Sequence, residues 1–211
     1  MRKWIPFVSI VAAWAISLAA FDQLPDRVPT HWNLRGEVDG WSGRTFGAFG
    51  FPALMIAIWG LLYWVPSIDP RRESYSKFRS TYDIVVAAII ALMLFVHATV
   101  IGTSLGYDIP VSIVIPLLVG GLLVLIGNLL PRARPNWFFG IRTPWTLSND
   151  RVWERTHRMG GRVMVLAGLL IAVTAFTPAL WMGIVIPIVA VGAAVIPIVY
   201  SYVAWRGERG T

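Results

Sequence analysis

Cysteine is missing from this sequence of 211 residues, and histidine occurs only three times. The lack of cysteine excludes disulfide bonds and thiol chemistry, and it leaves the redox compartment undetermined. A zinc site would need His31, His97 or His157 together with carboxylates. The spacing of these residues matches no specific zinc pattern. We therefore expect no metal and no other cofactor.

Charged residues are also scarce, at 14% of the chain, whereas 56% of the residues are hydrophobic. Soluble domains average roughly 25% charged residues. The apolar residues form blocks, and about 20 apolar residues suffice for a helix to cross the hydrocarbon core of a bilayer. The blocks cover residues 4–21, 46–65, 82–105, 109–130, 163–177 and 180–205. The sequence predicts an all-α bundle of six transmembrane helices.

The first block could instead be a secretory signal peptide, because it follows a short basic start. It is long for the apolar part of a signal peptide, and further spans follow it. We therefore interpret residues 4–21 as an uncleaved first helix.

The distribution of basic residues predicts the orientation of the bundle. With the N-terminus inside, 15 of the 18 Lys and Arg residues fall on the inner side, and only Arg27, Arg35 and Arg44 fall outside. The positive-inside rule expects such a split. We predict a multi-pass protein of the bacterial inner membrane with both termini in the cytoplasm. The net charge of +7 then reports topology, and no nucleic-acid partner is expected.

Two connections are long enough to carry a function. The outer connection, residues 22–45, belongs to a predicted N-terminal two-helix unit of residues 1–67. The inner connection, residues 131–162, belongs to a predicted C-terminal four-helix unit of residues 68–211. The remaining outer connections are too short to do more than reverse the chain.

The outer connection is rich in polar and aromatic side chains. Gly36 and Gly40 are expected to permit turn conformations that other residues avoid. One interpretation is a ligand-recognition surface, in which Trp32 and Trp41 offer apolar area and neighbouring polar groups orient the ligand. The candidate recognition residues are His31, Trp32, Asn33, Gly36, Asp39 and Gly40. The alternatives are a turn that satisfies its own hydrogen bonds and a metal site of His31 with Glu37 or Asp39.

The inner connection predicts a short helix that begins after Ser148, a residue able to cap its N-terminus. Pro144 favours an extended or turn conformation at Thr143. The positions i, i+3, i+4 and i+7 of the helix share one face, and they are Trp153, Thr156, His157 and Gly160. Flanking arginines suit anionic lipid headgroups. The segment is either a cytoplasmic docking platform or gate, or an anchor that seats the fifth span.

Other activities have weaker support in the sequence. His97 lies inside the third span, where an ionisable group is a functional candidate, although a neutral histidine can also bond between helices. Together with prolines inside several spans, it favours a small transporter or channel as the first alternative. Ser148, Asp150 and His157 lie too close in sequence for a hydrolase triad and lack a nucleophile elbow. A metal-assisted membrane enzyme is the third possibility, and we expect no catalytic residues.

Both connections resemble known signatures. Pro29-Thr-His-Trp-Asn-Leu-Arg-Gly-Glu-Val-Asp-Gly40 resembles the motif of a short bacterial membrane domain of unknown function. Gly140-Ile-Arg-Thr-Pro-Trp-Thr-Leu-Ser and Val152-Trp-Glu-Arg-Thr-His-Arg-Met-Gly-Gly resemble the SdpI family of integral membrane proteins. The motif residues expected to face a cytoplasmic partner are Asn136, Gly140, Arg142, Thr143, Pro144, Trp145, Trp153, Thr156, His157 and Arg158.

The resemblance implies a protein that protects its host against a secreted, membrane-active peptide toxin. For the name-giving member of the family it also implies signalling, in which the toxin-occupied protein holds a transcriptional repressor at the membrane. We therefore expect a non-enzymatic immunity protein with three partners: the lipid bilayer, a peptide toxin on the outer side, and a repressor on the cytoplasmic side.

Overall fold

The computed structural model describes residues 4–209, and six long helices dominate it. They are α1 (Trp4–Ala20), α2 (Arg44–Ile68), α3 (Ser74–Ser104), α4 (Val111–Leu129), α6 (Asp150–Thr174) and α7 (Ala179–Arg209). Each is long and apolar enough to cross a membrane, which confirms the prediction of six spans in an all-α bundle. Three one-turn pieces, Phe21–Gln23, Leu130–Arg132 and α5 (Pro144–Ser148), lie in the connections.

The fifth helix differs from its prediction. Residues 163–177 were expected to form a short span after a separate surface helix, but α6 is one continuous helix from Asp150 to Thr174. Ser148 was expected to cap it, and that prediction is wrong. Ser148 is the last residue of α5, whereas Asn149 is extended and its side chain accepts from the backbone nitrogens of Arg151 and Val152.

A β-hairpin lies in the outer connection, and the sequence analysis did not predict it. Strand β1 (Arg27–Trp32) pairs antiparallel with β2 (Val38–Gly43), with Pro29 opposite Trp41. The pairing is irregular between Pro29 and Trp32. The hairpin packs on the bundle through Val28, which is buried against the start of α2. Gly47 leaves the space for this contact, because a Cβ on Gly47 would lie 2.5 Å from the Cβ of Val28.

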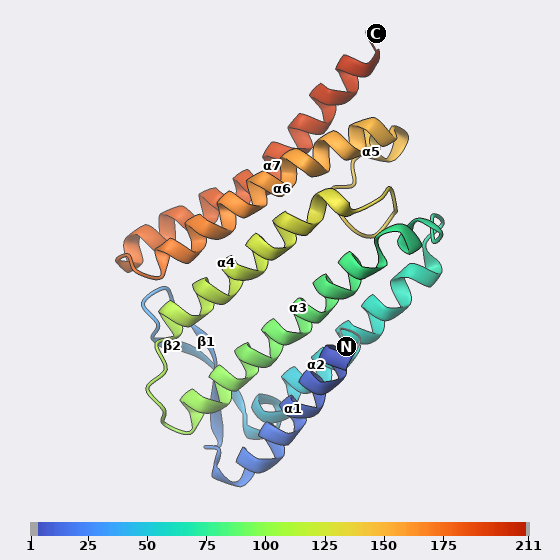
Figure 1. Cartoon of the computed structure of the whole chain (residues 1–211). Coiled ribbons are helices and arrows are strands. Elements are labelled where there is room, and N and C mark those ends of the chain that lie inside the picture. The colour runs from blue at the N-terminus through green and yellow to red at the C-terminus, as the bar shows by residue number, and fades with distance from the viewer. Residues whose placement is uncertain (1–3, 210–211) are drawn as a thin grey trace.

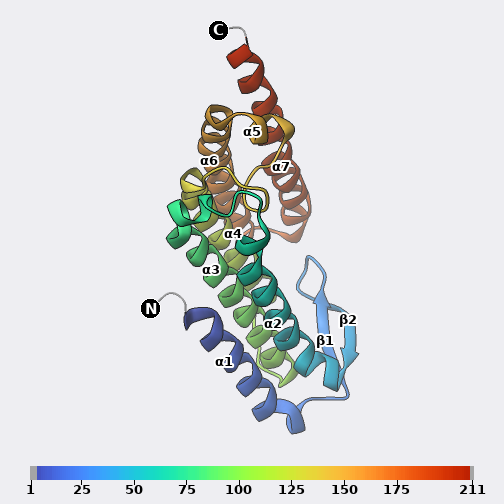
Figure 2. The same ribbon diagram turned by 90° about the vertical axis from the view of Figure 1, so that its right-hand side faces the viewer.

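The six long helices form two neighbouring groups (Figures 1 and 2). Helices α1, α2 and α3 pack together, α4, α6 and α7 pack together, and α3 lies beside α4. The hairpin and the α6–α7 turn lie at one end of the bundle, which we call the hairpin end. The α2–α3 and α4–α6 connections and the C-terminal end of α7 lie at the other, the motif end.

Successive long helices run in opposite directions, so the chain in α1 runs away from the motif end and the chain in α7 runs towards it (Figure 1). The chain therefore enters and leaves the bundle at the same side. That this side is the cytoplasm stays a prediction from the charge distribution. Arg2 and Lys3, which contribute to that prediction, lie outside the described residues.

Glycines join α4 to α6. A Cβ on Gly127 would lie 2.6 Å from the carbonyl oxygen of Gly161, and one on Gly120 would lie 2.5 Å from that of Gly168. The glycines are seven residues apart on each helix, so the same face of both helices repeats the contact one heptad further along. Small residues at such positions let backbones approach closely, which is a main source of helix association in lipid.

Candidate functional sites at the two ends of the bundle

Asn33 organises the tip of the hairpin. Its side-chain oxygen accepts from the backbone nitrogens of Arg35 (2.8 Å) and Glu37 (3.1 Å), and its amide donates to the Glu37 carboxylate (2.8 Å). Gly36 has a φ of +79°, in the left-handed region that favours glycine. The predicted turn role is therefore confirmed for Gly36, and Asn33 is bonded within the tip.

Gly40 was also expected to permit a turn conformation, and that reason is wrong. It lies inside β2, and among the described residues a positive φ occurs only at Gly36, Gly106 and Gly140. What Gly40 provides is space, because a Cβ there would lie 2.8 Å from the Cβ of His31 across the hairpin.

The hairpin carries two contacting pairs of exposed side chains, which we call the hairpin face: Arg27 with Trp41, and His31 with Asp39. His31 Nδ1 lies 2.5 Å from an Asp39 carboxylate oxygen, with 72% and 45% of the two side chains exposed. The guanidinium of Arg27 lies 5.5 Å from the ring centre of Trp41, a cation–π distance. Trp32 is not part of this face, because it is half-buried against a core of α1, α2 and α3 residues.

The hairpin tip reaches across to the second helix group. A Cβ on Gly36 would lie 3.3 Å from the side chain of Ser112, at the start of α4. A Cβ on Gly183, near the start of α7, would lie 2.9 Å from the Leu34 side chain. The outer motif therefore touches two helices, α4 and α7, that follow it at long sequence distances.

Asn136 begins the inner motif in a buried position. Its side-chain oxygen accepts from the backbone nitrogens of Phe138 (3.0 Å) and Phe139 (2.6 Å), and its amide donates to the carbonyl oxygens of Arg134 and Phe139. The asparagine thus holds the connection after α4 in a tight turn, because its oxygen and its amide both bond to backbone groups within that turn.

This turn is tied to the α2–α3 connection by two residues that the sequence analysis missed. Asp69 is 2% exposed, and its carboxylate accepts from the Trp137 backbone nitrogen (2.9 Å) and the Tyr75 hydroxyl (3.0 Å). The same hydroxyl lies 3.3 Å from the Asn136 side-chain oxygen. Asp69 follows a helix end and precedes Pro70, a pattern that signals only a turn, so its partner could not be read from the sequence.

His157 lies at the centre of the inner motif and is fully buried. Its Nε2 accepts from the backbone nitrogen of Ile141 (3.0 Å), so the proton of the neutral ring is on Nδ1, which donates to the Trp153 carbonyl oxygen (2.8 Å). The His157 and Trp153 rings stack at 4.0 Å. The indole nitrogen of Trp153 donates to the Ala133 carbonyl oxygen (2.9 Å).

Gly140 makes this arrangement possible. Its φ is +105°, and a Cβ at this position would collide with Nε2 of His157. Glycine is therefore required at this position for two reasons: it adopts the positive φ, and it leaves room for the His157 ring. The predicted shared face of Trp153, Thr156, His157 and Gly160 is confirmed, since all four are buried beneath the motif.

Thr143 and Pro144 start α5. Thr143 is extended, as predicted, and forms a capping box with Thr146, in which each side chain accepts from the other residue's backbone nitrogen. Its hydroxyl also lies 3.0 Å from that of Ser201 in α7. The indole of Trp145 packs against the ring of Tyr202 at 5.1 Å. These contacts attach the short helix to the last span.

The remaining motif residues stay at the surface. Arg142 and Arg158 are exposed, and Arg142 donates to the Trp137 carbonyl oxygen (3.0 Å). Trp137 and Phe138, in the same connection as Arg142, are 47% and 42% exposed. The inner motif thus divides into a buried scaffold and a set of exposed residues, which we call the motif patch: Trp137, Phe138, Arg142 and Arg158.

His97 lies inside the first helix group, away from both ends. Its Nε2 is 2.9 Å from the Ser17 hydroxyl, which donates to the Ala48 carbonyl oxygen at 2.6 Å. One serine therefore joins α1, α2 and α3. Nδ1 of His97 has no hydrogen-bond partner among residues 4–209, and the ring stacks on Phe51.

The candidate enzymatic sets are not assembled. His157 uses both ring nitrogens on the backbone, and the Ser148 hydroxyl donates to the Trp145 carbonyl oxygen. Glu37 is bonded to Asn33 rather than to His31. Within the described part of the chain, no three His, Asp or Glu side chains converge as metal ligands would.

Both signatures correspond to known protein families. Residues 132–201 match the model of the SdpI/YfhL protein family, and residues 8–56 match that of a domain of unknown function, DUF1648. The chain is 26% identical over 212 residues to the Immunity protein SdpI of Bacillus subtilis (strain 168), and the match covers 100% of both proteins. The last third of the chain is therefore similar to the SdpI/YfhL family, and the whole chain is similar to an immunity protein. The six apolar helices and these matches place the chain in the bacterial cell membrane as a multi-pass protein.

A second relative is the uncharacterized protein YfhL of Bacillus subtilis (strain 168). It is 37% identical over 59 residues, which cover 26% of this chain and 54% of that protein. No solved structure matches the chain. The DUF1648 match spans most of α1, the hairpin and the first half of α2. The SdpI/YfhL match spans the inner motif, all of α6 and most of α7.

Proposed function

We propose that this chain is a non-enzymatic immunity protein, which protects the cell that carries it against a secreted, membrane-active peptide toxin. The full-length similarity to a protein named for immunity carries this proposal. The geometry supports it, since each of the two family motifs forms an ordered structure at its own end of the bundle.

The hairpin face is the surface that we assign to the toxin. Trp41 offers an exposed ring, and Arg27, His31 and Asp39 offer charge of both signs beside it. An aromatic side chain among exposed polar groups is a common arrangement at protein interfaces. The charge distribution predicts that this end faces outward, where a secreted peptide arrives.

Contact between the hairpin tip and the second helix group offers a route for signalling. Leu34 and Gly36 lie against the starts of α7 and α4, and both helices continue to the motif end. A toxin that displaces the tip would therefore shift the helices that carry the motif patch.

A cytoplasmic transcriptional repressor is the partner that we assign to the motif patch. Only the exposed residues can touch a partner, because Asn136, Trp153 and His157 are fully buried. In toxin-treated cells, replacing Arg142 with alanine should release a fluorescent fusion of a candidate repressor from the membrane. Arg132→Ala, an exposed arginine outside the motif, should not. If neither variant changes the distribution of the fusion, the motif patch is not the docking surface.

Complementation tests the immunity function directly. The chain is expressed in a Bacillus subtilis strain that lacks its own Immunity protein SdpI, and the cells are challenged with the toxin to which that protein confers immunity. The toxin encoded nearest the gene of this chain is tested in parallel. Survival above that of the empty-vector strain in either challenge is expected. Unchanged killing in both, at verified membrane expression, would contradict the proposal.

The transporter alternative receives no support from the geometry of His97. A transported ion or solute would need access to the ring, whereas His97 is fully buried and bonded to Ser17 at a junction of three helices. This is the interhelical bonding role that polar residues play in many membrane bundles.

A further inference from the structure

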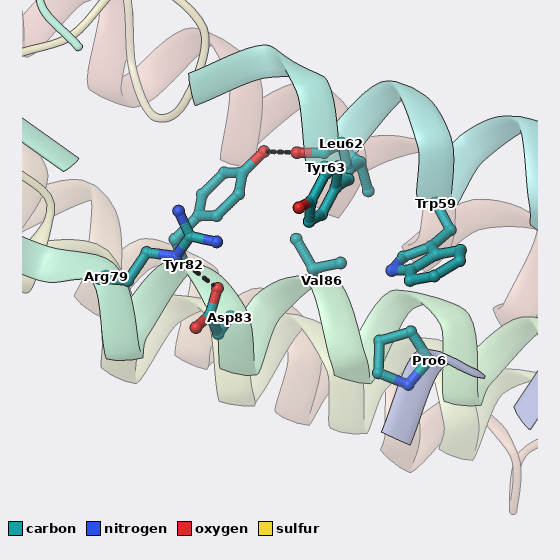
Figure 3. Close-up of a pocket in the computed structure, with 8 residues that line it drawn as sticks. All are labelled: Pro6, Trp59, Leu62, Tyr63, Arg79, Tyr82, Asp83 and Val86. Carbon is teal, nitrogen blue, oxygen red and sulfur yellow. Dashed lines mark hydrogen bonds and ion pairs between the residues drawn. The ribbon is translucent and has the colours of Figure 1, made fainter. Parts of the chain in front are cut away.

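A cleft of about 180 Å³ opens near the motif end of the first helix group (Figure 3). Three helices line it, and the lining residues are Pro6 of α1, Trp59, Leu62 and Tyr63 of α2, and Arg79, Tyr82, Asp83 and Val86 of α3. Neither family motif contributes to it, so its presence needs a separate explanation.

One cation and one carboxylate meet in this cleft. Arg79 Nε donates to an Asp83 carboxylate oxygen at 2.9 Å. The terminal nitrogens of the guanidinium point away from Asp83, and no described residue accepts a hydrogen bond from them (Figure 3). Tyr82 forms a wall rather than a donor, because its hydroxyl already donates to the Leu62 carbonyl oxygen (2.6 Å).

The surroundings of the cleft change from polar to apolar along the helices. A neighbouring hollow shares Tyr63 and Arg79 and extends to Ser67, Arg72 and Ser76 at the α2–α3 connection. In the other direction the walls are apolar. Tyr63 lies five residues before the end of α2, or about 7.5 Å along the helix axis. That depth matches the headgroup layer of a bilayer, roughly 5–8 Å on each side.

We propose that the cleft binds the headgroup of a zwitterionic phospholipid with a primary ammonium, of the phosphatidylethanolamine class. The free guanidinium nitrogens of Arg79 donate to the phosphate, and Asp83 accepts from the ammonium. Val86, Leu62 and Pro6 contact the first part of the acyl chains. The volume is below the roughly 300–1,000 Å³ of pockets that enclose a whole drug-sized ligand, so the tails remain in the bilayer.

The charge pair selects among lipid headgroups. An anionic phosphatidylglycerol could also place its phosphate on Arg79, but its headgroup carries no ammonium, so Asp83 and the phosphate would share the single positive charge of Arg79. The quaternary ammonium of phosphatidylcholine has no N–H to donate. The ethanolamine headgroup is the one that satisfies both side chains. This site does not depend on the proposed immunity function.

Native mass spectrometry of the purified full chain tests the site. The protein is equilibrated with equal amounts of phosphatidylethanolamine, phosphatidylglycerol and phosphatidylcholine with identical acyl chains, and the retained lipid is counted. Phosphatidylethanolamine should be retained most. Asp83→Asn should shift the preference to phosphatidylglycerol, and Arg79→Gln should reduce the retention of both by roughly tenfold, the loss of one charged hydrogen bond.

Arg134 and Glu154 provide a matched control, because they form an exposed ion pair of the same length, 2.9 Å, at the same end of the bundle. Arg134→Gln and Glu154→Gln should leave lipid retention unchanged. Equal retention of the three lipids by the unmodified protein, or equal loss in the control variants, would overturn the site. Free phosphoethanolamine at the same concentration should not displace the lipid, and displacement would overturn the assignment to a bilayer ligand. If Arg79→Gln does not fold, the Asp83→Asn reversal decides alone.

Discussion

Replacing Gly140 with alanine should destabilise the protein more than the same replacement at Gly36 or Gly106, the other two described glycines with a positive φ. The new Cβ would occupy a position with a φ of +105° and would collide with His157 Nε2. A left-handed conformation costs a non-glycine residue roughly 1–2 kcal/mol. Loss of the bond from the Ile141 backbone nitrogen adds about 1–3 kcal/mol, because a buried donor stays unsatisfied. The expected loss in the free energy of unfolding is therefore about 2–5 kcal/mol.

Gly106 offers a matched control for this change. Its φ is +87°, yet a Cβ there would meet nothing within 4 Å. Gly106→Ala should therefore cost only the conformational part, roughly 1–2 kcal/mol. Thermal unfolding of both variants in the same detergent, followed by size-exclusion chromatography after heating, separates the two contributions. A Gly140→Ala protein as stable as Gly106→Ala would refute the reasoning that His157 and Gly140 hold the motif together.

Three further substitutions probe the bundle by the same thermal assay. Gly168→Val should destabilise the protein by about 1–3 kcal/mol, because its Cβ would lie 2.5 Å from the Gly120 carbonyl oxygen. Gly121→Val should leave the stability unchanged, because a Cβ there would meet nothing within 4 Å. Tyr75→Phe should cost about 1–3 kcal/mol by removing a donor from a buried carboxylate, and an unchanged melting temperature would exclude that link. His97→Ala should cost about 2–4 kcal/mol and leave solute flux into proteoliposomes unchanged, and a loss of flux would revive the transporter interpretation.

The number of spans could be predicted because the hydrocarbon core accepts only long apolar helices. Their ends could not. Residues 74–81 and 150–162 are polar and yet helical, since a helix continues without penalty into the headgroup layer and water. A hydropathy pattern records where the lipid ends rather than where the helix ends.

The hairpin was missed because its strands give little local signal. Each has only six residues, β1 contains Pro29, and β2 has glycines at positions 40 and 43. Its stability comes from contacts with α2, α3 and the starts of α4 and α7, which no local pattern reveals. The polar residues at its tip were correctly singled out, but their partners are one another.

The inner motif shows a similar limit. Periodicity predicted the buried face of α6 correctly, because residues four apart share a side of a helix. Which motif residues form the scaffold and which form the surface depends on long-range contacts. The partner of Asn136 through Tyr75 is Asp69, more than sixty residues away in sequence. Basic residues of the same motif therefore play different roles: Arg142 and Arg158 are exposed, whereas His157 is buried.

Site-specific photocrosslinking tests most directly whether the toxin meets the hairpin face. A benzophenone amino acid replaces either Trp41 or Trp137, two tryptophans at opposite ends of the bundle with 49% and 47% of their surface exposed. Cells that express each variant are treated with the toxin that the chain confers survival against, and are then illuminated. The account predicts a toxin adduct at position 41 and none at position 137. An adduct at position 137, or protection without an adduct at position 41, would contradict it.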